Sequence, residues 1–313
     1  MKIFGGSASL DLAKKIADIL SVPVFSVDVH VFPDGERRVR IVEEVLDEDC
    51  VVIQSACPPV DNNYMELFFL VDALRRSGAK TVTAVVPYFG YQRQDHVFRE
   101  GEAVSLEVVI RVLETLKVDR LLSVDMHTPK IPDMFDIPVD HLSALSLFAE
   151  KIKKEGWGGE DTVLVSPDMG GIARIKKISE FLDNMAYVAI EKNRDLESGS
   201  LEVSSLGEGN ISGQKRGIIV DDMIASGNTI ALAAKFLKTQ GIDEIFVFAT
   251  HAVFSEEAPK ILQESLVDKV FVTDTVEVEA NKKFPKLEII SAAGLIARDL
   301  KDPMDSNDPL LSM

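Results

Sequence analysis

The sequence predicts an α/β protein of two similar domains, each with a mainly parallel sheet flanked by helices. Short β-branched segments alternate with stretches of helical periodicity along nearly the whole chain, which is typical of strand–helix–strand crossovers. The length of 313 residues favours two cores of about 150 residues each over one large core. Both halves contain a strand that ends in Val-Asp, at Asp125 and at Asp221, which suggests a duplicated unit.

Ten strands follow from the β-branched segments. In the first half they cover residues 2–4, 24–32, 51–54, 82–87 and 121–125. In the second half they cover residues 163–166, 187–190, 218–220, 245–249 and 270–273. Parallel strands are buried on both faces, which accounts for their continuous apolar character.

Amphipathic segments between these strands predict the helices. Leu12, Ile16 and Leu20 recur at one-face spacing after a small-residue turn. Asp61 is expected to cap a helix that ends near Gly78, because Asp favours the start of a helix and Gly its end.

A polar, glycine-containing stretch at residues 151–161 marks the expected domain boundary. We therefore expect an N-terminal domain over residues 1–150 and a C-terminal domain over residues 151–313. The final helix is expected to pack back on the N-terminal domain. Residues 302–313 are expected to form a frayed end.

Composition and absent motifs exclude several classes of function. There are 34 basic and 51 acidic residues, and the net charge of −17 disfavours nucleic-acid and membrane binding. Two cysteines, no signal peptide and no stretch of 18 apolar residues favour a cytoplasmic protein. The P-loop pattern, the dinucleotide-binding glycine pattern and the protein-kinase motifs do not occur.

The most specific segment follows the predicted strand 218–220. Two acids are followed by a small-residue loop at the start of a helix: Asp221, Asp222, Ala225, Ser226, Gly227, Asn228 and Thr229. The loop amides and hydroxyls can bind a phosphate at the positive end of the helix dipole, and the acids can accept hydrogen bonds from sugar hydroxyls. A ribose 5-phosphate fits this pattern. The alternative is that the acids only end a strand and the glycine only turns the chain.

Two further strand ends carry potential cation ligands. His127 follows the strand 121–125, and Asp168 follows the strand 163–166. Open α/β sheets bind ligands at the carboxyl ends of their strands, and Mg²⁺ suits a polyphosphate substrate there. The alternative for His127 is a capping or buried structural histidine.

Three more segments have a functional and a structural interpretation. The cations of Lys192 and Arg194 can stabilise a transferring phosphoryl group, or they can form a solvated charged loop. The sequence from Phe32 to Glu36 is a turn that also offers an aromatic ring and carboxylates to a nucleoside. The segment 88–95 interleaves aromatic residues with Arg93 and Gln94, which suits a nucleotide, although its aromatic residues also suit a core.

Taken in order, six motifs closely resemble those of the ribose-phosphate diphosphokinase (phosphoribosyl pyrophosphate synthetase) family. They are Phe-Pro-Asp-Gly-Glu, Tyr-Phe-Gly-Tyr with Arg-Gln-Asp, Asp-Met-His, Ser-Pro-Asp-Met-Gly-Gly, Lys-Asn-Arg and Val-Asp-Asp-Met-Ile. The similarity spans the chain from residue 3 to about residue 300. It implies two phosphoribosyltransferase-type domains and an enzyme that transfers the β,γ-diphosphoryl group of ATP to the 1-hydroxyl of ribose 5-phosphate, giving phosphoribosyl diphosphate and AMP.

The resemblance also implies a role for each matching residue. Lys192 and Arg194 match the catalytic cations, and His127 and Asp168 match the magnesium-associated positions. The ATP site is matched by Phe32, Asp34, Gly35, Glu36, Arg93 and Gln94. The ribose 5-phosphate site is matched by the acids and the small-residue loop at residues 221–229. In the family the Phe32–Glu36 motif reaches the neighbouring subunit, which implies a homo-oligomer built from dimers, commonly a hexamer.

Three other functions are compatible with parts of this pattern. A non-catalytic regulatory relative keeps the fold, but the cations and metal-associated residues present here argue against it. A phosphoribosyltransferase shares the Asp-Asp loop but lacks the motifs around residues 32–36 and 93–95. A ribose-phosphate sensor is expected to carry an added nucleic-acid-binding region, which the sequence does not contain.

Overall fold

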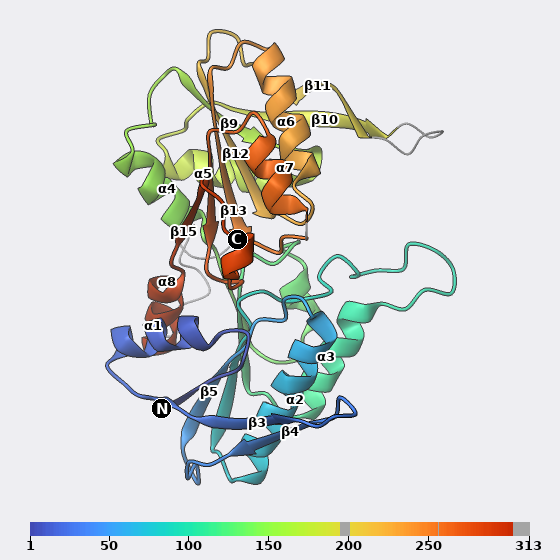
Figure 1. Cartoon of the computed structure of the whole chain (residues 1–313), viewed down its shortest axis with the longest axis vertical. Coiled ribbons are helices and arrows are strands. Elements are labelled where there is room, and N and C mark those ends of the chain that lie inside the picture. Colours follow the sequence, from blue (N-terminus) through green and yellow to red (C-terminus); the bar gives the residue numbers. More distant parts are fainter. Residues whose placement is uncertain (195–200, 256, 303–313) are drawn as a thin grey trace. The chain divides into compact units, whose positions relative to one another are not determined.

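The computed structural model describes residues 1–194, 201–255 and 257–302, and of residues 192–194, 201–206 and 208 the backbone alone. The chain forms two compact units (Figure 1). Unit 1 holds Met1–Ser143, Thr275–Glu277 and the described residues from Ser291 onward, and unit 2 holds the described residues of Ala144–Asp274 and Val278–Ile290. The expected boundary at residues 151–161 lies inside unit 2, because helix α4 (Leu145–Lys154) and the loop after it cover that stretch.

Unit 1 contains a six-stranded parallel sheet in the order β2-β1-β5-β6-β7-β8. Its strands are β1 (Lys2–Gly5), β2 (Val24–Phe25), β5 (Asp49–Ile53), β6 (Thr81–Val85), β7 (Arg120–Val124) and β8 (Val139–Leu142). The inner strands β5 and β7 are each buried at four of their five residues, as their apolar sequences require.

Helices cover both faces of this sheet. They are α1 (Leu10–Leu20), α2 (Val60–Arg76), α3 (Ser105–Thr115) and α8 (Ala293–Lys301), with a 3₁₀ turn at Ile131–Met134. The apolar faces of α2 and α3 pack with strand residues into one core that includes Leu67, Leu70 and Ile110. Helix α1 packs on α8, so the final helix belongs to unit 1. Asp61 does not cap α2, which begins after Pro59, and instead accepts a hydrogen bond from the Tyr91 hydroxyl.

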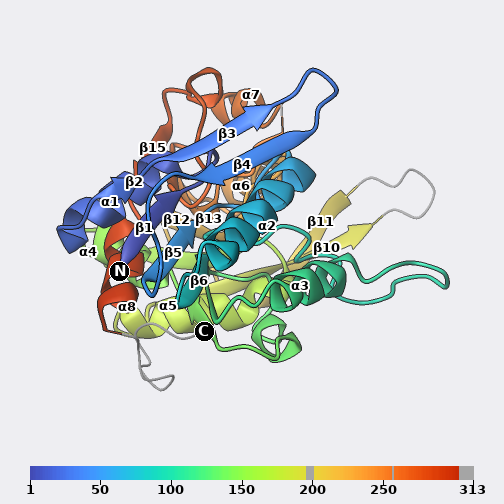
Figure 2. The same cartoon turned by 90° about the horizontal axis from the view of Figure 1, so that it is seen from below.

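The predicted strand 24–32 is divided in two. β2 pairs with β1 in the main sheet, whereas β3 (Val27–Val31) pairs with the antiparallel strand β4 (Arg37–Ile41). The second pairing gives a separate two-stranded sheet, which lies over helix α2 (Figure 2). A single long strand was therefore the wrong prediction here, because the backbone changes partner at Ser26.

Unit 2 contains a seven-stranded sheet in the order β11-β10-β9-β12-β13-β14-β15. Its strands are β9 (Thr162–Ser166), β10 (Tyr187–Arg194), β11 (Leu201–Glu208), β12 (Arg216–Met223), β13 (Glu244–His251), β14 (Lys269–Thr273) and β15 (Leu287–Ile290). All pairs are parallel except β10 with β11. These two strands extend from the sheet as an antiparallel arm (Figures 1 and 2).

Two layers of helix enclose the sheet of unit 2. Helices α6 (Asn228–Thr239) and α7 (Ala258–Glu264) pack into a core with the strands, while α4 contacts α5 (Ile172–Phe181). Short 3₁₀ turns lie at Met169–Gly171 and Ala280–Lys282. No helix in the described part of the chain is both long and apolar enough to cross a membrane.

The two units share one strand order. When the parallel strands of each unit are numbered along the chain, both sheets run 2-1-3-4-5-6. The Val-Asp endings that suggested a duplication are not equivalent, because Asp125 follows the fifth parallel strand of unit 1, whereas Asp221 lies within the third of unit 2. The similarity of the halves therefore lies in their topology and not in that dipeptide.

Candidate active site

The strand order of unit 2 reverses between β9 and β12. Ligands of open parallel sheets bind beside the carboxyl ends of the two strands at such a reversal. Asp168 follows β9, and Asp221 and Asp222 lie at the end of β12. The structure thus brings together, in unit 2, acids that are more than 50 residues apart in the sequence.

The small-residue loop leads from β12 into helix α6. Ala225 accepts a hydrogen bond from the Ser255 amide, 2.8 Å from nitrogen to oxygen, which fixes the path of the loop. Gly227 has a φ of +79°, a conformation that favours glycine, and precedes the first residue of α6. Ser226 and Asn228 are exposed and Thr229 is half-buried, so this helix start can receive a phosphate.

Arg174 on helix α5 holds the two acids at the end of β12. Its Nη1 is 3.2 Å from Oδ1 of Asp221, and its Nη2 is 3.5 Å from Oδ1 of Asp222. Burial and the adjacent Asp222 carboxylate raise the pKa of Asp221 well above its ordinary value, while Arg174 opposes that shift. Arg174 was not predicted as a site residue. The available signal was a basic residue shortly after the Gly170-Gly171 pair.

Asp168 is held by its own turn. Its Oδ1 accepts a hydrogen bond from the Gly170 amide over 3.1 Å, and its carbonyl oxygen accepts one from the Ser166 hydroxyl over 2.7 Å. A Cβ at Gly171 would lie 2.4 Å from the Ser166 Oγ, so the paired glycines allow the tight turn. Asp168 is half-buried, and its charge acts on Asp221.

Lys192 and Arg194 lie in a strand and not in the loop that was expected. Their backbones continue β10, where Lys192 pairs with Val203 and Arg194 with Leu201 of β11. The side chains of both residues, and residues 195–200, lie outside the described part of the chain. β10 is the neighbour of β9, so the arm leaves the sheet on the strand adjacent to the one that precedes Asp168.

The turn from Phe32 to Glu36 joins β3 to β4 in unit 1. The Gly35 amide donates to the carbonyl oxygen of Phe32 over 2.9 Å, and the Glu36 amide donates to Oδ1 of Asp34 over 3.1 Å. The whole turn is exposed, and the Phe32 ring packs edge-on against His30. Its aromatic and acidic side chains are therefore accessible to a ligand.

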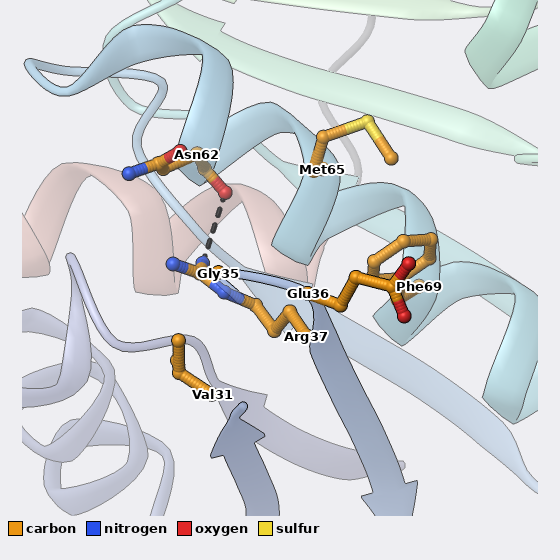
Figure 3. A pocket seen from close by; sticks show the side chains of 7 residues that line it. All are labelled: Val31, Gly35, Glu36, Arg37, Asn62, Met65 and Phe69. Atoms are coloured by element: carbon orange, nitrogen blue, oxygen red, sulfur yellow. Dashed lines mark hydrogen bonds between the residues drawn. The ribbon is translucent and has the colours of Figure 1, made fainter. Parts of the chain in front are cut away.

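A hollow of about 570 Å³ lies between this turn and helix α2 (Figure 3). It is lined by Val31, Gly35, Glu36, Arg37, Asn62, Met65 and Phe69. The guanidinium of Arg37 spans the hollow and donates to the carbonyl oxygen of Asn62 over 3.0 Å.

Glu66 connects the hairpin to the rest of unit 1 and was not predicted. The side chain is buried, and its Oε2 accepts hydrogen bonds from Arg37 Nη1 at 2.7 Å and from the Ser7 hydroxyl at 2.8 Å. The Ser7 amide donates to Oε1 at 2.6 Å. Nothing in the local sequence distinguishes Glu66 from a solvent-facing helix residue, because its partners lie 29 and 59 residues away.

The other predicted residues of unit 1 lie in the loops after β6 and β7. Arg93 and Gln94 are exposed in the loop after β6. His127 is exposed in the turn after β7, and its amide donates to Oε1 of the buried residue Gln92 over 2.8 Å. The loops after β6 and β7 are thus linked by a direct hydrogen bond.

The equivalent strand reversal in unit 1 lies between β1 and β5. Polar groups of the residues there are hydrogen-bonded to other residues of the chain. Gln54 Oε1 accepts from the Ala8 amide over 3.0 Å, and the Ser55 amide donates to Ser9 Oγ over 2.8 Å. The Ser55 hydroxyl donates to the carbonyl oxygen of Thr275. Because these groups are already paired, the reversal in unit 2 is the better candidate for the sugar phosphate.

The described residues contain no group of three or more His, Cys, Asp or Glu side chains arranged to hold a metal ion. Mg²⁺ commonly keeps several waters and binds through one or two carboxylates together with substrate phosphates. A carboxylate such as Asp168 fits that mode of binding, whereas a closed protein cage is not formed by these residues.

Comparisons with known proteins agree with this architecture. The model of the N-terminal domain of ribose phosphate pyrophosphokinase matches residues 1–116, and that of the phosphoribosyl synthetase-associated domain matches residues 204–306. A ribose-phosphate pyrophosphokinase from Fusobacterium nucleatum is 38% identical over 297 residues, covering 95% of this chain and 93% of that protein. A ribose-phosphate pyrophosphokinase from Streptococcus mutans is 39% identical over 298 residues, covering 95% and 92%.

A solved structure shows the same fold. The crystal structure of phosphoribosylpyrophosphate synthetase from Mycobacterium smegmatis superposes with a TM-score of 0.87 at 37% identity, covering 96% of this chain and 97% of that one. Sequence identity and fold therefore agree over nearly the full length of both chains. The chain belongs to the ribose-phosphate pyrophosphokinase family.

Proposed function

We propose that this protein is a ribose-phosphate pyrophosphokinase that makes phosphoribosyl diphosphate and AMP from ribose 5-phosphate and ATP. The observation that carries the proposal is the arrangement at the strand reversal of unit 2, where two acids, a small-residue loop and a helix start adjoin Asp168. The reaction itself is inferred from membership of the family.

The sugar phosphate binds at the end of β12. The 5-phosphate is received by Ala225, Ser226, Gly227, Asn228 and Thr229, at the positive end of the α6 dipole. Asp221 and Asp222 accept hydrogen bonds from the ribose hydroxyls, and Arg174 fixes their orientation. These contacts hold the 1-hydroxyl in place for attack.

The nucleotide is bound by residues of unit 1. Phe32 stacks on the adenine, and Asp34, Gly35 and Glu36 contact the nucleoside. Arg93 and Gln94 contact the phosphates. All six residues are exposed, and Arg93 offers a positive charge to the polyphosphate in a protein whose net charge is −17.

In the reaction, the 1-hydroxyl oxygen of ribose 5-phosphate forms a bond to the β-phosphorus of ATP. The bond from that phosphorus to the oxygen bridging to the α-phosphate breaks, and AMP leaves with the bridging oxygen. The proton of the hydroxyl is released. Lys192 and Arg194, on the β10 strand, act as the catalytic cations that stabilise the negative charge of the transferred group.

His127 and Asp168 are the residues proposed to hold Mg²⁺, directly or through its waters. When bound, the ion neutralises and orients the polyphosphate oxygens. Asp168 contributes a carboxylate whose position is fixed by the Gly170 amide. His127 contributes an exposed imidazole on a turn whose amides are anchored.

We also propose a homo-oligomer built from dimers, with a hexamer as the expected size. Exposed apolar side chains support this proposal: Val31 and Phe32 belong to the β3–β4 hairpin, and Met65 lies on α2. Val31 and Met65 line the hollow in Figure 3. Light scattering coupled to size-exclusion chromatography measures the mass, and a monomer at micromolar concentration would contradict the proposal.

One assay tests the reaction. Purified protein is incubated with ribose 5-phosphate, ATP and Mg²⁺, and the phosphorus NMR spectrum is followed with time. Phosphoribosyl diphosphate and AMP are expected in equal amounts, and both are expected to be absent when EDTA replaces Mg²⁺. Production of ADP and a phosphorylated sugar would identify a different kinase.

A further inference from the structure

The turn after β7 contains a residue in a strained backbone conformation. Asp125 has a φ of +39° and is completely buried. Such a conformation is unfavourable for a residue other than glycine and persists only where surrounding contacts fix it. The contacts that fix this turn therefore indicate which residues control it.

Three consecutive amides of the turn are each bound. The Asp125 amide donates to the carbonyl oxygen of Leu142 over 2.8 Å. The Met126 amide donates to Nε2 of His141 over 2.7 Å, and the His127 amide donates to Oε1 of Gln92 over 2.8 Å. Two of the three acceptors are side chains from other elements, β8 and the loop after β6.

Gln92 is fully buried, at 1% exposure, and its orientation is fixed by this contact. A main-chain N–H needs an acceptor, so the carboxamide oxygen must face His127. The buried Nε2 then finds no hydrogen-bond partner among the described residues. An unpaired buried donor lowers stability, so the hydrogen bond from the His127 amide to Gln92 comes with a cost at the other end of the carboxamide.

The segment that carries Gln92 is itself anchored. The Tyr64 hydroxyl on α2 donates to the carbonyl oxygen of Gly90 over 2.8 Å, and the Ala56 amide donates to that of Tyr88 over 2.9 Å. The imidazole of His127, in contrast, is exposed. A buried, anchored glutamine thus supports a turn that presents an exposed side chain.

We infer that Gln92 is a positioning residue. By accepting a hydrogen bond from the His127 amide, it fixes the position of His127 relative to Arg93, the residue that follows Gln92 in the chain. His141 holds the adjacent Met126 amide in the same way. The inference rests on the proposed function, in which His127 and Arg93 act on the metal–polyphosphate end of ATP. It assigns to Gln92 a role through the backbone, with no contact to substrate.

Gln54 provides a matched control elsewhere in unit 1. It is fully buried, its Oε1 accepts from the Ala8 amide over 3.0 Å, and its Nε2 also has no hydrogen-bond partner within the described residues. Ala8 belongs to the loop after β1, which carries none of the proposed ligand contacts. Gln54→Met and Gln92→Met therefore remove the same kind of bond at different places.

The first test is hydrogen–deuterium exchange of the full-length wild type and of both variants, without ligands. Gln92→Met is expected to speed exchange in a peptide spanning residues 124–128 by at least about tenfold, and Gln54→Met to leave that peptide unchanged. Gln92→Glu retains an oxygen acceptor and is expected to restore slow exchange. Equal exchange in all four proteins would overturn the inference.

The second test is steady-state kinetics with Mg²⁺ and ATP. Gln92→Met is expected to lower kcat by at least about tenfold while leaving the KM for ribose 5-phosphate unchanged, because that substrate binds in unit 2. Gln54→Met is expected to keep kcat within about twofold. Equal losses in both variants, or an unchanged kcat in Gln92→Met, would reject the positioning role.

The two proposals fail in different ways. If the wild type forms no phosphoribosyl diphosphate, the proposed function is wrong, and the exchange experiment alone then decides whether Gln92 holds the turn. A ¹³C-labelled histidine spectrum gives an independent signal from the five imidazoles. The resonance that disappears in His127→Asn is expected to broaden in Gln92→Met and to stay sharp in Gln54→Met.

Discussion

Arg174 on helix α5 donates a hydrogen bond to Asp221 at the end of β12, with 3.2 Å between Nη1 and Oδ1. The same guanidinium lies 3.5 Å from Asp222. Two adjacent carboxylates in a mostly buried site repel each other, and the cation between them makes this arrangement stable. Arg174 therefore acts on the proposed sugar site without belonging to the loop proposed to bind the phosphate.

Replacing Arg174 by methionine is expected to lower the free energy of unfolding by about 3 kcal/mol, because it leaves two buried carboxylates without their cation. The KM for ribose 5-phosphate is expected to rise. Urea denaturation and kinetics measure the two effects. Arg216→Met is the control, since its ion pair with the half-exposed Glu244 contributes at most about 1 kcal/mol. Equal losses in both variants would contradict the role of Arg174.

Lys192→Ala is expected to lower kcat by about 10² while ATP binding is retained, because the cation acts on charge that develops in the transition state. Calorimetric titration of the variant with ATP and Mg²⁺ measures binding separately from turnover. A parallel loss of ATP binding and of turnover would show that Lys192 contributes to ground-state affinity instead.

Gly227→Ala places a side chain on a residue with a φ of +79°. The added Cβ would also lie 3.2 Å from Cγ of Leu262, so the loop must shift or remain strained. We expect a loss of about 1–3 kcal/mol in unfolding free energy and a KM for ribose 5-phosphate raised by roughly tenfold. Gly241→Ala is the comparison, because its φ is +87° but an added Cβ there would meet no atom within 4 Å, and Gly241 has no proposed ligand role. If both variants raise this KM equally, backbone strain near the phosphate is not the cause.

Glu66→Gln tests whether the hairpin must be tied to α2 for ATP to bind. The variant loses the charge that pairs with Arg37, and we expect it to be less stable by about 2 kcal/mol. The KM for ATP is expected to rise while that for ribose 5-phosphate stays constant. Glu107→Gln breaks an exposed pair with Arg111 on α3 and should change neither constant.

Glu288 gives a pH-dependent stability. Partial burial works to raise its pKa, but hydrogen bonds from Lys151 and Lys269 outweigh that effect and hold the pKa below the ordinary value. A lowered folded-state pKa means that the stabilisation is present above the unfolded-state pKa of about 4.3 and is lost as the pH falls through the folded-state value. At pH 7 the wild type is therefore expected to have a higher urea midpoint than Glu288→Gln. Below pH 4 the difference between the two midpoints is expected to be smaller. A constant difference would exclude the linkage.

Nine of the ten predicted strands match strands of the two main sheets, because parallel strands are apolar throughout and are separated by amphipathic helices. The tenth, residues 24–32, is two strands with different partners. The prediction misses β4, β8 and β15, whose residues are partly exposed and carry charges, so they do not stand out from loops, and it also misses β11. The strand nature of Lys192 and Arg194 depends on pairing with β11, which is not a local property.

The candidate site is predictable only where its residues share a segment. The acids and loop at 221–229 are contiguous, so a local pattern identifies them. Arg174, Glu66 and Gln92 act on residues 29 to 59 positions away, and their role exists only once the chain has folded. No spacing rule in the sequence relates such residues to one another.

The two units contain extra antiparallel strands at the same point of their shared strand order. In each unit the connection between the second and third parallel strands is interrupted by extra antiparallel structure, β3 and β4 in one and β11 in the other. Both interruptions carry or adjoin residues assigned to substrate, at Phe32–Glu36 and at Lys192–Arg194. In both units the same crossover thus presents the proposed substrate residues from an antiparallel hairpin, while the pairing of the parallel strands is continuous.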